Sequence, residues 1–284
     1  MAKMASKPLF ESSFSSFLFI LFAMANFTNT TWAQTWSYCN PTNTTVPCKP
    51  NPALGIQGAT FDFVNNTIDT DVWNVTAGQP VSRQQGLAFT VNKRGDAPTM
   101  QTNWYMMFGQ VSVVMKAATG QGIISSIVLE SDDLDEVDWE FIGNNNTHVE
   151  TNYFGKGNTT SYDRAIYYPV QTPNDMFHNY SLTWTAEKLE WYIDDNLIRT
   201  LKYEDALGGQ NFPQTPMNLR LGIWAGGDKD NNKYTIEWAG GVTDYEKGPY
   251  NMVVQKVVAS DFSTGKEYVW GDTTGSWQSI KSVK

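Results

Sequence analysis

Polar and apolar residues alternate over short stretches along most of the chain, and turn-forming residues interrupt the alternation roughly every 8–12 residues. This spacing is typical of a sandwich or a barrel, and no segment keeps the helical period of about 3.6 residues over a helical length. We therefore predict a single all-β domain in which two antiparallel sheets pack face to face. Strands are expected over residues 110–116, 122–129, 149–154, 180–185, 189–193, 197–202, 218–224, 234–238 and 252–258.

The start of the chain has the features of a secretory signal peptide. Lys3 and Lys7 provide positive charge, and residues 17–25 form an uninterrupted apolar run. Small residues then favour cleavage after residue 33, with an earlier Ala-Met-Ala as a second candidate signal. The apolar run is too short to span a bilayer, which takes about 20 residues. We expect residues 1–33 to be removed and residues 34–284 to form one exported domain.

Three further features bear on secretion. Cys39 and Cys48 are the only cysteines, and in an oxidising compartment we expect them to form a structural disulfide. No hydrophobic tail precedes Lys284, so a GPI anchor requires a natural chain that continues past this residue. Asn-x-Ser/Thr sequons, which we expect to carry glycans, begin at Asn43, Asn65, Asn74, Asn145, Asn158 and Asn179.

The charge balance narrows the class of partner. Lys and Arg number 20 against 29 Asp and Glu, which gives a net charge of −9 and argues against a nucleic-acid or anionic-membrane partner. Aromatic residues make up 14% of the chain, which suits sugar ligands but also suits strands. With two histidines and two cysteines, a zinc site or a Ser-His-Asp triad is not expected. We predict a monomer without a metal or cofactor.

One predicted strand carries an unusual row of acids. Residues 135–143 read Asp-Glu-Val-Asp-Trp-Glu-Phe-Ile-Gly. Because side chains on a strand alternate between faces, Glu136, Asp138 and Glu140 share one face and the apolar residues between them share the other. Acids are depleted from strands, and neighbouring like charges repel. The row therefore has a folding cost, which points to a chemical role.

Glycoside cleavage with retention uses two carboxyl groups about 5–5.5 Å apart, one as nucleophile and one as proton donor. The Cα atoms of Glu136 and Glu140 would lie roughly 13 Å apart, and the side chains can lean towards each other. Asp138 between them should push one pKa above the others. The spacing alone does not decide between retention and inversion. A solvated acidic face, or a Ca²⁺ site that includes the aspartates of residues 132–135, remains an alternative.

At this strand the sequence resembles a known family. Residues 135–140 are similar to the D-E-[IV]-D-x-E signature of glycoside hydrolase family 16, a β-jelly-roll family. Residues 102–116 resemble the strand that precedes the catalytic one, and residues 177–184 (FHNYSLTW) resemble its F-H-x-Y-x-x-x-W stretch. Residues 234–241 are similar to the fungal Crh branch of chitin–glucan transglycosylases. The resemblance covers about residues 38–260 and implies a jelly roll with a concave active-site cleft.

By position, the resemblance implies that Glu136 is the nucleophile, Asp138 an auxiliary carboxylate and Glu140 the general acid/base of a retaining enzyme. It implies transfer from a chitin donor to β-1,3- or β-1,6-glucan, with weak chitinase-like hydrolysis, in the fungal cell wall. The chain departs from many Crh members in having too few cysteines for a chitin-binding module and no anchor signal. An endo-β-glucan hydrolase of the same family and a non-catalytic lectin-like sandwich are the alternatives.

Candidate sugar-binding residues complete the expected site. Trp224 and Trp238 are either stacking platforms for sugar rings or core residues. Glu237 is expected to hydrogen-bond a sugar through the Crh resemblance. Further candidates that flank the expected cleft by family position are Tyr105, Phe154, Tyr162 and Arg164.

Overall fold

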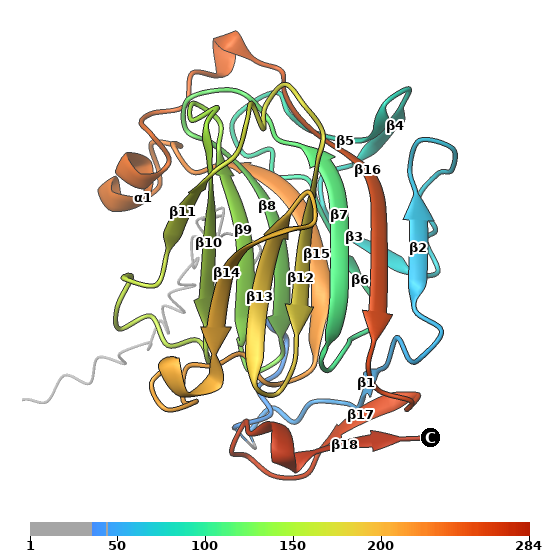
Figure 1. Ribbon diagram of the computed structural model, residues 1–284. Helices are drawn as coiled ribbons and strands as arrows, with labels where there is room; N and C mark the ends of the chain where they lie inside the picture. The colour runs from blue at the N-terminus through green and yellow to red at the C-terminus, as the bar shows by residue number, and fades with distance from the viewer. Residues whose placement is uncertain (1–35, 44) are drawn as a thin grey trace, which may run out of the picture.

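The computed structural model describes residues 36–43 and 45–284, which are drawn in colour in Figure 1. The predicted signal peptide, residues 1–33, lies outside this part of the chain. Among the described residues, no helix is long and apolar enough to cross a membrane.

Two antiparallel sheets packed against each other form the body of the described chain (Figure 1). The seven-stranded sheet contains, in spatial order, β11 (Ile166–Pro169), β10 (His148–Phe154), β9 (Glu136–Ile142), β8 (Ile123–Ser131), β15 (Met217–Ala225), β6 (Thr99–Thr102) and β3 (Trp73–Ala77). The eight-stranded sheet contains β14 (Asn196–Lys202), β13 (Lys188–Ile193), β12 (His178–Trp184), β7 (Gly109–Lys116), β16 (Tyr250–Asp261), β5 (Gly86–Val91) and β4 (Val81–Arg83), with β2 (Ala59–Asp62) paired to β16. The predicted all-β sandwich is confirmed.

Smaller elements flank the two sheets. A three-stranded sheet, seen at the bottom of Figure 1, is formed by β1 (Asn51–Pro52), β17 (Glu267–Trp270) and β18 (Ile280–Val283). Three 3-10 turns, η1 (Tyr203–Asp205), η2 (Tyr245–Lys247) and η3 (Trp277–Ser279), lie in the connections. The one α-helix of the described residues, α1 (Lys233–Trp238), lies beyond β10 and β11 at the upper left of Figure 1.

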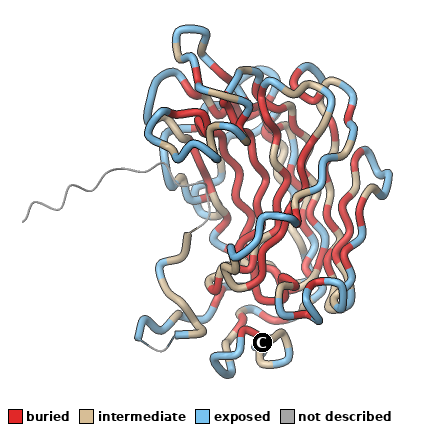
Figure 2. The backbone as a smooth tube through the Cα atoms, turned by 90° about the vertical axis from the view of Figure 1, so that its left-hand side faces the viewer, coloured by how far each residue is buried: buried red, intermediate tan, exposed pale blue. Residues whose placement is uncertain are grey.

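The core lies between the two large sheets, where Figure 2 shows continuous buried strands. Trp139 of β9, Trp184 of β12 and Trp191 of β13 are fully buried. Trp139 meets Tyr180 of the opposite sheet edge to face, with ring centroids 5.4 Å apart. Because large aromatic side chains contribute most of the apolar area that a core buries, these rings fix how the sheets sit on each other.

One predicted strand is wrong. Residues 234–238 form helix α1, although their aromatic and β-branched residues favour a strand locally. The Asn232 side chain accepts hydrogen bonds from the backbone N–H groups of Tyr234 and Thr235, as an N-cap residue does. Gly240 follows the helix with a φ of 85°, a left-handed conformation that commonly ends a helix. The capping residues outweigh the strand propensity of the segment between them. Each of the other predicted strands is present.

The segment before β1 contains a loop closed by a disulfide and a contact with the seven-stranded sheet. The predicted disulfide between Cys39 and Cys48 is present, with Cα atoms 5.3 Å apart. Trp36 accepts a hydrogen bond of 3.0 Å through its carbonyl from the guanidinium of Arg220 on β15, and its indole ring lies against the same guanidinium. The start of the described chain is thereby attached to the seven-stranded sheet.

Trp139 offers a test of how far packing between the sheets sets stability. Trp139→Ala should lower the free energy of unfolding by about 3–5 kcal/mol, because it leaves a cavity in the centre of the core. Trp139→Phe keeps an aromatic ring and removes a buried indole N–H that has no hydrogen-bond partner, so it should cost clearly less. Urea unfolding curves for both variants compare the two losses. Equal losses would show that ring packing is not what this position supplies.

Candidate active site

The two faces of β9 have different surroundings. Val137, Trp139 and Phe141 are buried in the core, and the rings of Trp139 and Phe141 both contact Tyr180 of the opposite sheet. Because successive side chains alternate, the carboxyl groups between these apolar residues point to the face of the seven-stranded sheet that lies away from the eight-stranded sheet. The alternation expected from the sequence is therefore present in the structure.

Neighbouring strands add two more carboxyl groups to this face. In the β8–β9 register Glu130 stands opposite Glu136, and in the β9–β10 register Glu150 stands opposite Glu140. Directly opposed residues of an antiparallel pair have Cβ atoms about 4.5–5.5 Å apart, so the side chains are in reach of each other. Asp138 completes the row between them. Neither Glu130 nor Glu150 was identified from the sequence, because strand register decides which residues become neighbours.

Positive charge is concentrated at the Glu136 end of the row. Arg220 of β15 forms a buried ion pair with Glu130, with Nη1 and Oε2 2.5 Å apart. The charges of Arg220 and Arg164 both lower the pKa of Glu136. A hydrogen bond with Asp138 lowers it as well. The ionised form of Glu136 is therefore stabilised from three directions.

The surroundings of the three carboxyl groups shift their pKa values to different extents. Burial raises the pKa of Glu136 to about 7, against the lowering effect of its partners. Burial, followed by the charges of Glu136 and Glu140, raises the pKa of Asp138 well above its ordinary value. Burial and the charge of Glu150 raise that of Glu140 well above its ordinary value. Of the three, only Glu136 has nearby cations and a hydrogen-bond donor, so it is the first to ionise as pH rises. Asp138 is that donor, and we expect Glu140 to hold its proton to higher pH than Glu136.

Three of the predicted sugar-binding residues lie together beside Glu136. Phe154 stands opposite Glu136 in the β9–β10 register. The guanidinium of Arg164 lies 4.5 Å from the Phe154 ring centroid and donates hydrogen bonds to the carbonyls of Asn158 and Ser161. Tyr162 meets Phe154 edge to face and is 74% exposed. The group presents one exposed and one buried aromatic ring around a cation.

The two predicted tryptophans lie near the Glu140 end of the row. Trp224 of β15 and Trp238 of α1 stack with ring centroids 6.1 Å apart. Trp224 is buried in a small apolar cluster with Ile124, Ile142 and Ala239, separate from the main core. Trp238 is partly exposed, and its indole N–H donates to Glu150. Of the two interpretations, packing fits Trp224, whereas Trp238 keeps part of its side chain exposed.

Two predicted residues are less closely associated with the carboxyl row. The Tyr105 hydroxyl donates to Asp132 at 3.1 Å, outside β9. Glu237 is exposed on α1, immediately before Trp238. In the described part of the chain, no hydrogen bond or ion pair joins Tyr105 or Glu237 to Glu136, Asp138 or Glu140.

Asp135 anchors the start of β9. Its carboxylate accepts hydrogen bonds from the backbone N–H groups of Lys156 and Gln214 and from the Thr215 hydroxyl. The same hydroxyl lies 2.7 Å from Asp133, which is also buried. Three separate segments thus meet at the turn that leads into β9. These aspartates, included above in the Ca²⁺ alternative, hold the backbone of this turn.

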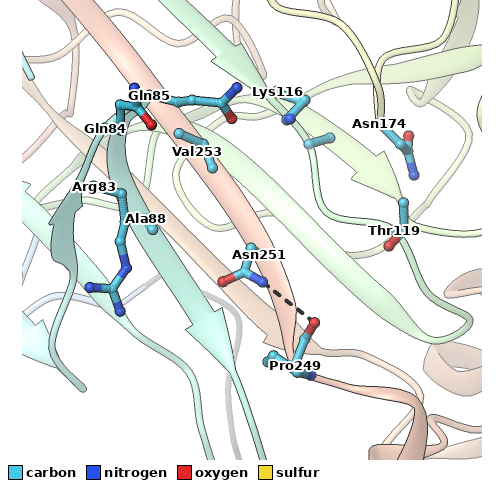
Figure 3. A pocket seen from close by; sticks show the side chains of 11 residues that line it. Arg83, Gln84, Gln85, Ala88, Lys116, Thr119, Asn174, Pro249, Asn251 and Val253 are labelled. Carbon is cyan, nitrogen blue, oxygen red and sulfur yellow. Dashed lines mark hydrogen bonds between the residues drawn. The ribbon is translucent and has the colours of Figure 1, made fainter. Parts of the chain in front are cut away.

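A separate pocket of about 530 Å³ is shown from close by in Figure 3. Residues of β4, β5, β7 and β16 line it, including Arg83, Lys116 and Asn251. These strands belong to the eight-stranded sheet, so the pocket is remote from the carboxyl row.

Comparison with known proteins places this arrangement in a family. The family described as Glycosyl hydrolases family 16 matches residues 68–240. The chain belongs to this family. Crh-like protein 2 of Botryotinia fuckeliana is 60% identical over 253 residues, which are 88% of this chain and 55% of that protein. Congo red hypersensitive protein 1 of Saccharomyces cerevisiae is 46% identical over 244 residues, 86% of this chain and 47% of that protein. The chain thus spans about half the length of these two relatives.

Solved structures agree with the family assignment. A Crh5 transglycosylase in complex with NAG superposes with a TM-score of 0.83 and 55% identity, over 86% of this chain and 99% of that one. A Bacillus licheniformis β-glucanase superposes with a TM-score of 0.59 at 21% identity, over 72% of this chain and 98% of that one, and shares the fold. The family's β-jelly roll, expected from the sequence, is confirmed.

The buried aspartates beside β9 predict how stability varies with pH. Burial, and then the charge of Asp135, raise the pKa of Asp133, so the folded protein holds a proton that the unfolded chain releases above about pH 4. The contribution of this group to stability is present at low pH and is lost as pH rises through the folded pKa. Asp133→Asn keeps an acceptor for Thr215 without an ionisable group. Urea unfolding should therefore show a smaller loss of stability between about pH 5 and about pH 9 in the variant than in the parent.

The control for this test is Asp195→Asn, which makes the same chemical change at an exposed turn residue. It should leave the pH dependence of unfolding unchanged. If Asp133→Asn also leaves it unchanged, Asp133 is ionised in the folded protein and the assignment of the proton is wrong.

Proposed function

We propose that this protein is a retaining cell-wall transglycosylase that moves chitin chains onto β-1,3- or β-1,6-glucan. The observation that carries the proposal is the row of Glu136, Asp138 and Glu140 along β9, between Glu130 of β8 and Glu150 of β10. A hydrogen bond and two cations favour the charge of Glu136, whereas burial and the charge of Glu150 raise the pKa of Glu140. The similarity to a transglycosylase solved with NAG, the sugar unit of chitin, supports the donor. The Crh-like relatives support a fungal cell-wall location.

In the first step the carboxylate of Glu136 attacks the anomeric carbon of the donor, and Glu140 gives its proton to the departing glycosidic oxygen. A covalent glycosyl-enzyme forms, and the reducing-end fragment leaves. Asp138 donates a hydrogen bond to Glu136 before the attack and holds that carboxylate in place. Proton donor and nucleophile are thus supplied by one strand.

In the second step Glu140, now ionised, takes the proton of an acceptor hydroxyl. The hydroxyl oxygen bonds to the anomeric carbon, and Glu136 leaves as a carboxylate. Two inversions restore the original anomeric configuration. A glucan hydroxyl gives transfer and a water molecule gives hydrolysis, so the weak hydrolytic activity is the same reaction with a different acceptor.

The aromatic groups at the two ends of the row supply the proposed sugar contacts. We assign Phe154, Arg164 and Tyr162 to sugars on the Glu136 side and Trp238 to sugars on the Glu140 side. Aromatic rings stack on the apolar faces of pyranose rings, and guanidinium groups donate to their hydroxyls. Tyr105 and Glu237 stay candidates for longer substrates. No metal or cofactor takes part in this scheme.

The remaining proposals concern the protein as it leaves the cell. We propose export with removal of residues 1–33, a single domain over residues 34–284 and a monomeric state. Glycans are proposed at the six sequons, all of which start at an exposed or partly exposed asparagine. Treatment with an endoglycosidase and mass measurement of the secreted protein would show the glycans and the mature start directly.

A product assay tests the reaction. A chitin oligosaccharide donor is incubated with a fluorescent laminarin oligosaccharide, and products are separated by size. Labelled products longer than the acceptor are expected. Glu136→Gln removes the nucleophile and should reduce their formation by a factor on the order of 10³ or more while sugar binding is kept.

The other outcomes identify the alternatives. Shortened donor without labelled hybrids would mean a hydrolase of the same family. Full activity in Glu136→Gln would exclude this residue as nucleophile. Binding of chitin and β-glucans without any turnover would leave the lectin-like sandwich as the function.

Asp138 provides a second test, since its proposed part is to donate a hydrogen bond rather than to react. Asp138→Ala removes the donor and should raise the pKa of Glu136, so kcat should fall by about 10²-fold and the acidic limb of its pH profile should move to higher pH. Asp138→Asn keeps an N–H donor and should lose less. If Asn and Ala are equally inactive, Asp138 acts through its ionisation and not through the hydrogen bond.

A further inference from the structure

Glu150 is a buried carboxyl group that the proposed mechanism does not use. It belongs to β10, stands opposite Glu140 in the β9–β10 register, and is 2% exposed. Among the described residues no ion pair involves Glu150, although burying a carboxylate is costly unless the charge is compensated. Its position beside Glu140 therefore needs a reason other than folding.

Two donors from different elements converge on Glu150. The indole Nε1 of Trp238, on α1, donates to Oε2 at 2.7 Å. The hydroxyl of Tyr167, which stands opposite Glu150 in the β10–β11 register, also donates to its carboxylate. An indole N–H can only donate, so this contact favours the ionised form of Glu150 over a protonated one. The more distant Arg199, on β14 of the other sheet, adds attraction.

We propose that Glu150 is a positioning residue that keeps the proton on Glu140 between turnovers, with Trp238 and Tyr167 holding Glu150 in its ionised form. The inference rests on the proposed function, in which Glu140 is the acid/base. Two neighbouring carboxyl groups with one proton between them place that proton on the member with fewer donors. Glu140 is that member, and helix α1 supplies one of the donors that decide the outcome.

The other groups that face Glu140 do not replace this effect. Glu136 and Asp138 lie on its own strand. Glu136 contributes less than Glu150 to raising the pKa of Glu140, and burial raises the pKa of Asp138 well above its ordinary value. Ser126 of β8, which stands opposite Glu140 on the other side, carries no charge. Tyr167 of β11 reaches Glu150 and is neutral, because its pKa is raised by burial and by that carboxylate.

The arrangement serves both steps of the reaction. Before cleavage, the charge of Glu150 keeps Glu140 protonated and ready to act as an acid. After cleavage, Glu140 is an anion beside another anion, which makes it a stronger base towards the acceptor hydroxyl. The proton returns to Glu140 as the acceptor oxygen bonds to the anomeric carbon and the bond to Glu136 breaks.

The test is a direct titration of Glu140 in the full-length secreted protein without substrate. Glutamate labelled with ¹³C at the side-chain carboxyl is followed by NMR, and Glu140→Gln assigns the signal. Glu150→Gln keeps an oxygen for Trp238 and Tyr167 but removes the charge. It should move the titration of Glu140 to lower pH by about one unit or more. The basic limb of kcat for donor cleavage should move with it.

Glu246→Gln, the same change at an exposed residue of η2, is the matched control and should shift neither the titration of Glu140 nor the rate profile.

Tyr167→Phe is a second variant, for use if Glu150→Gln does not fold, because it changes a side chain that is 44% exposed. Removing its hydroxyl leaves Glu150 with one donor fewer and should move the titration of Glu140 to lower pH, by less than Glu150→Gln does. An unchanged Glu140 titration in this variant would overturn the assignment of Tyr167 as a donor.

The titration separates this inference from the proposed function. An unmoved Glu140 titration in folded Glu150→Gln would overturn the role of Glu150, even in an active transglycosylase. A shifted titration in a protein that forms no transfer or cleavage products would uphold the electrostatic coupling and reject the enzymatic function instead.

Discussion

The arrangement of the site depends on the contact between the apolar face of β9 and the opposite sheet. Once Trp139 and Phe141 are fixed against Tyr180, the carboxyl groups between them have a single direction in which to point. Packing on the other side of the same strand offsets the free-energy cost of placing several acids side by side. A polar substitution on the apolar face would therefore act on the chemistry without touching a substrate.

Partial desolvation then turns three similar side chains into groups with different behaviour. In open water Glu136, Asp138 and Glu140 would all be ionised at neutral pH. In the folded protein each has its own surroundings: cations and a donor for Glu136, two flanking carboxyl groups for Asp138, and Glu150 for Glu140. The pKa values of these carboxyl groups therefore depend less on residue type than on the side chains that neighbouring strands place beside them.

The sequence reveals the part of the site that lies within one strand, and it does not reveal the part that depends on how strands pair. The alternation over residues 135–143 lies within one strand, so the two faces of β9 are readable directly. Glu150 becomes a neighbour of Glu140 only through the register of β9 and β10, which local patterning does not specify. Residues 234–238 favour a strand by themselves and form helix α1 instead, because the capping residues Asn232 and Gly240 lie outside that segment. The burial of Trp224 likewise follows from where α1 packs.

The contact between Arg220 and Trp36 has a practical consequence. Arg220 lies close enough to Glu136 to act on its charge, and it also holds the carbonyl of Trp36. A fusion partner joined immediately upstream of Trp36 would emerge beside the carboxyl row and could obstruct long polysaccharides. The other end of the chain lies in the small sheet of β1, β17 and β18, at the bottom of Figure 1. Affinity purification and surface immobilisation are therefore better designed around that end.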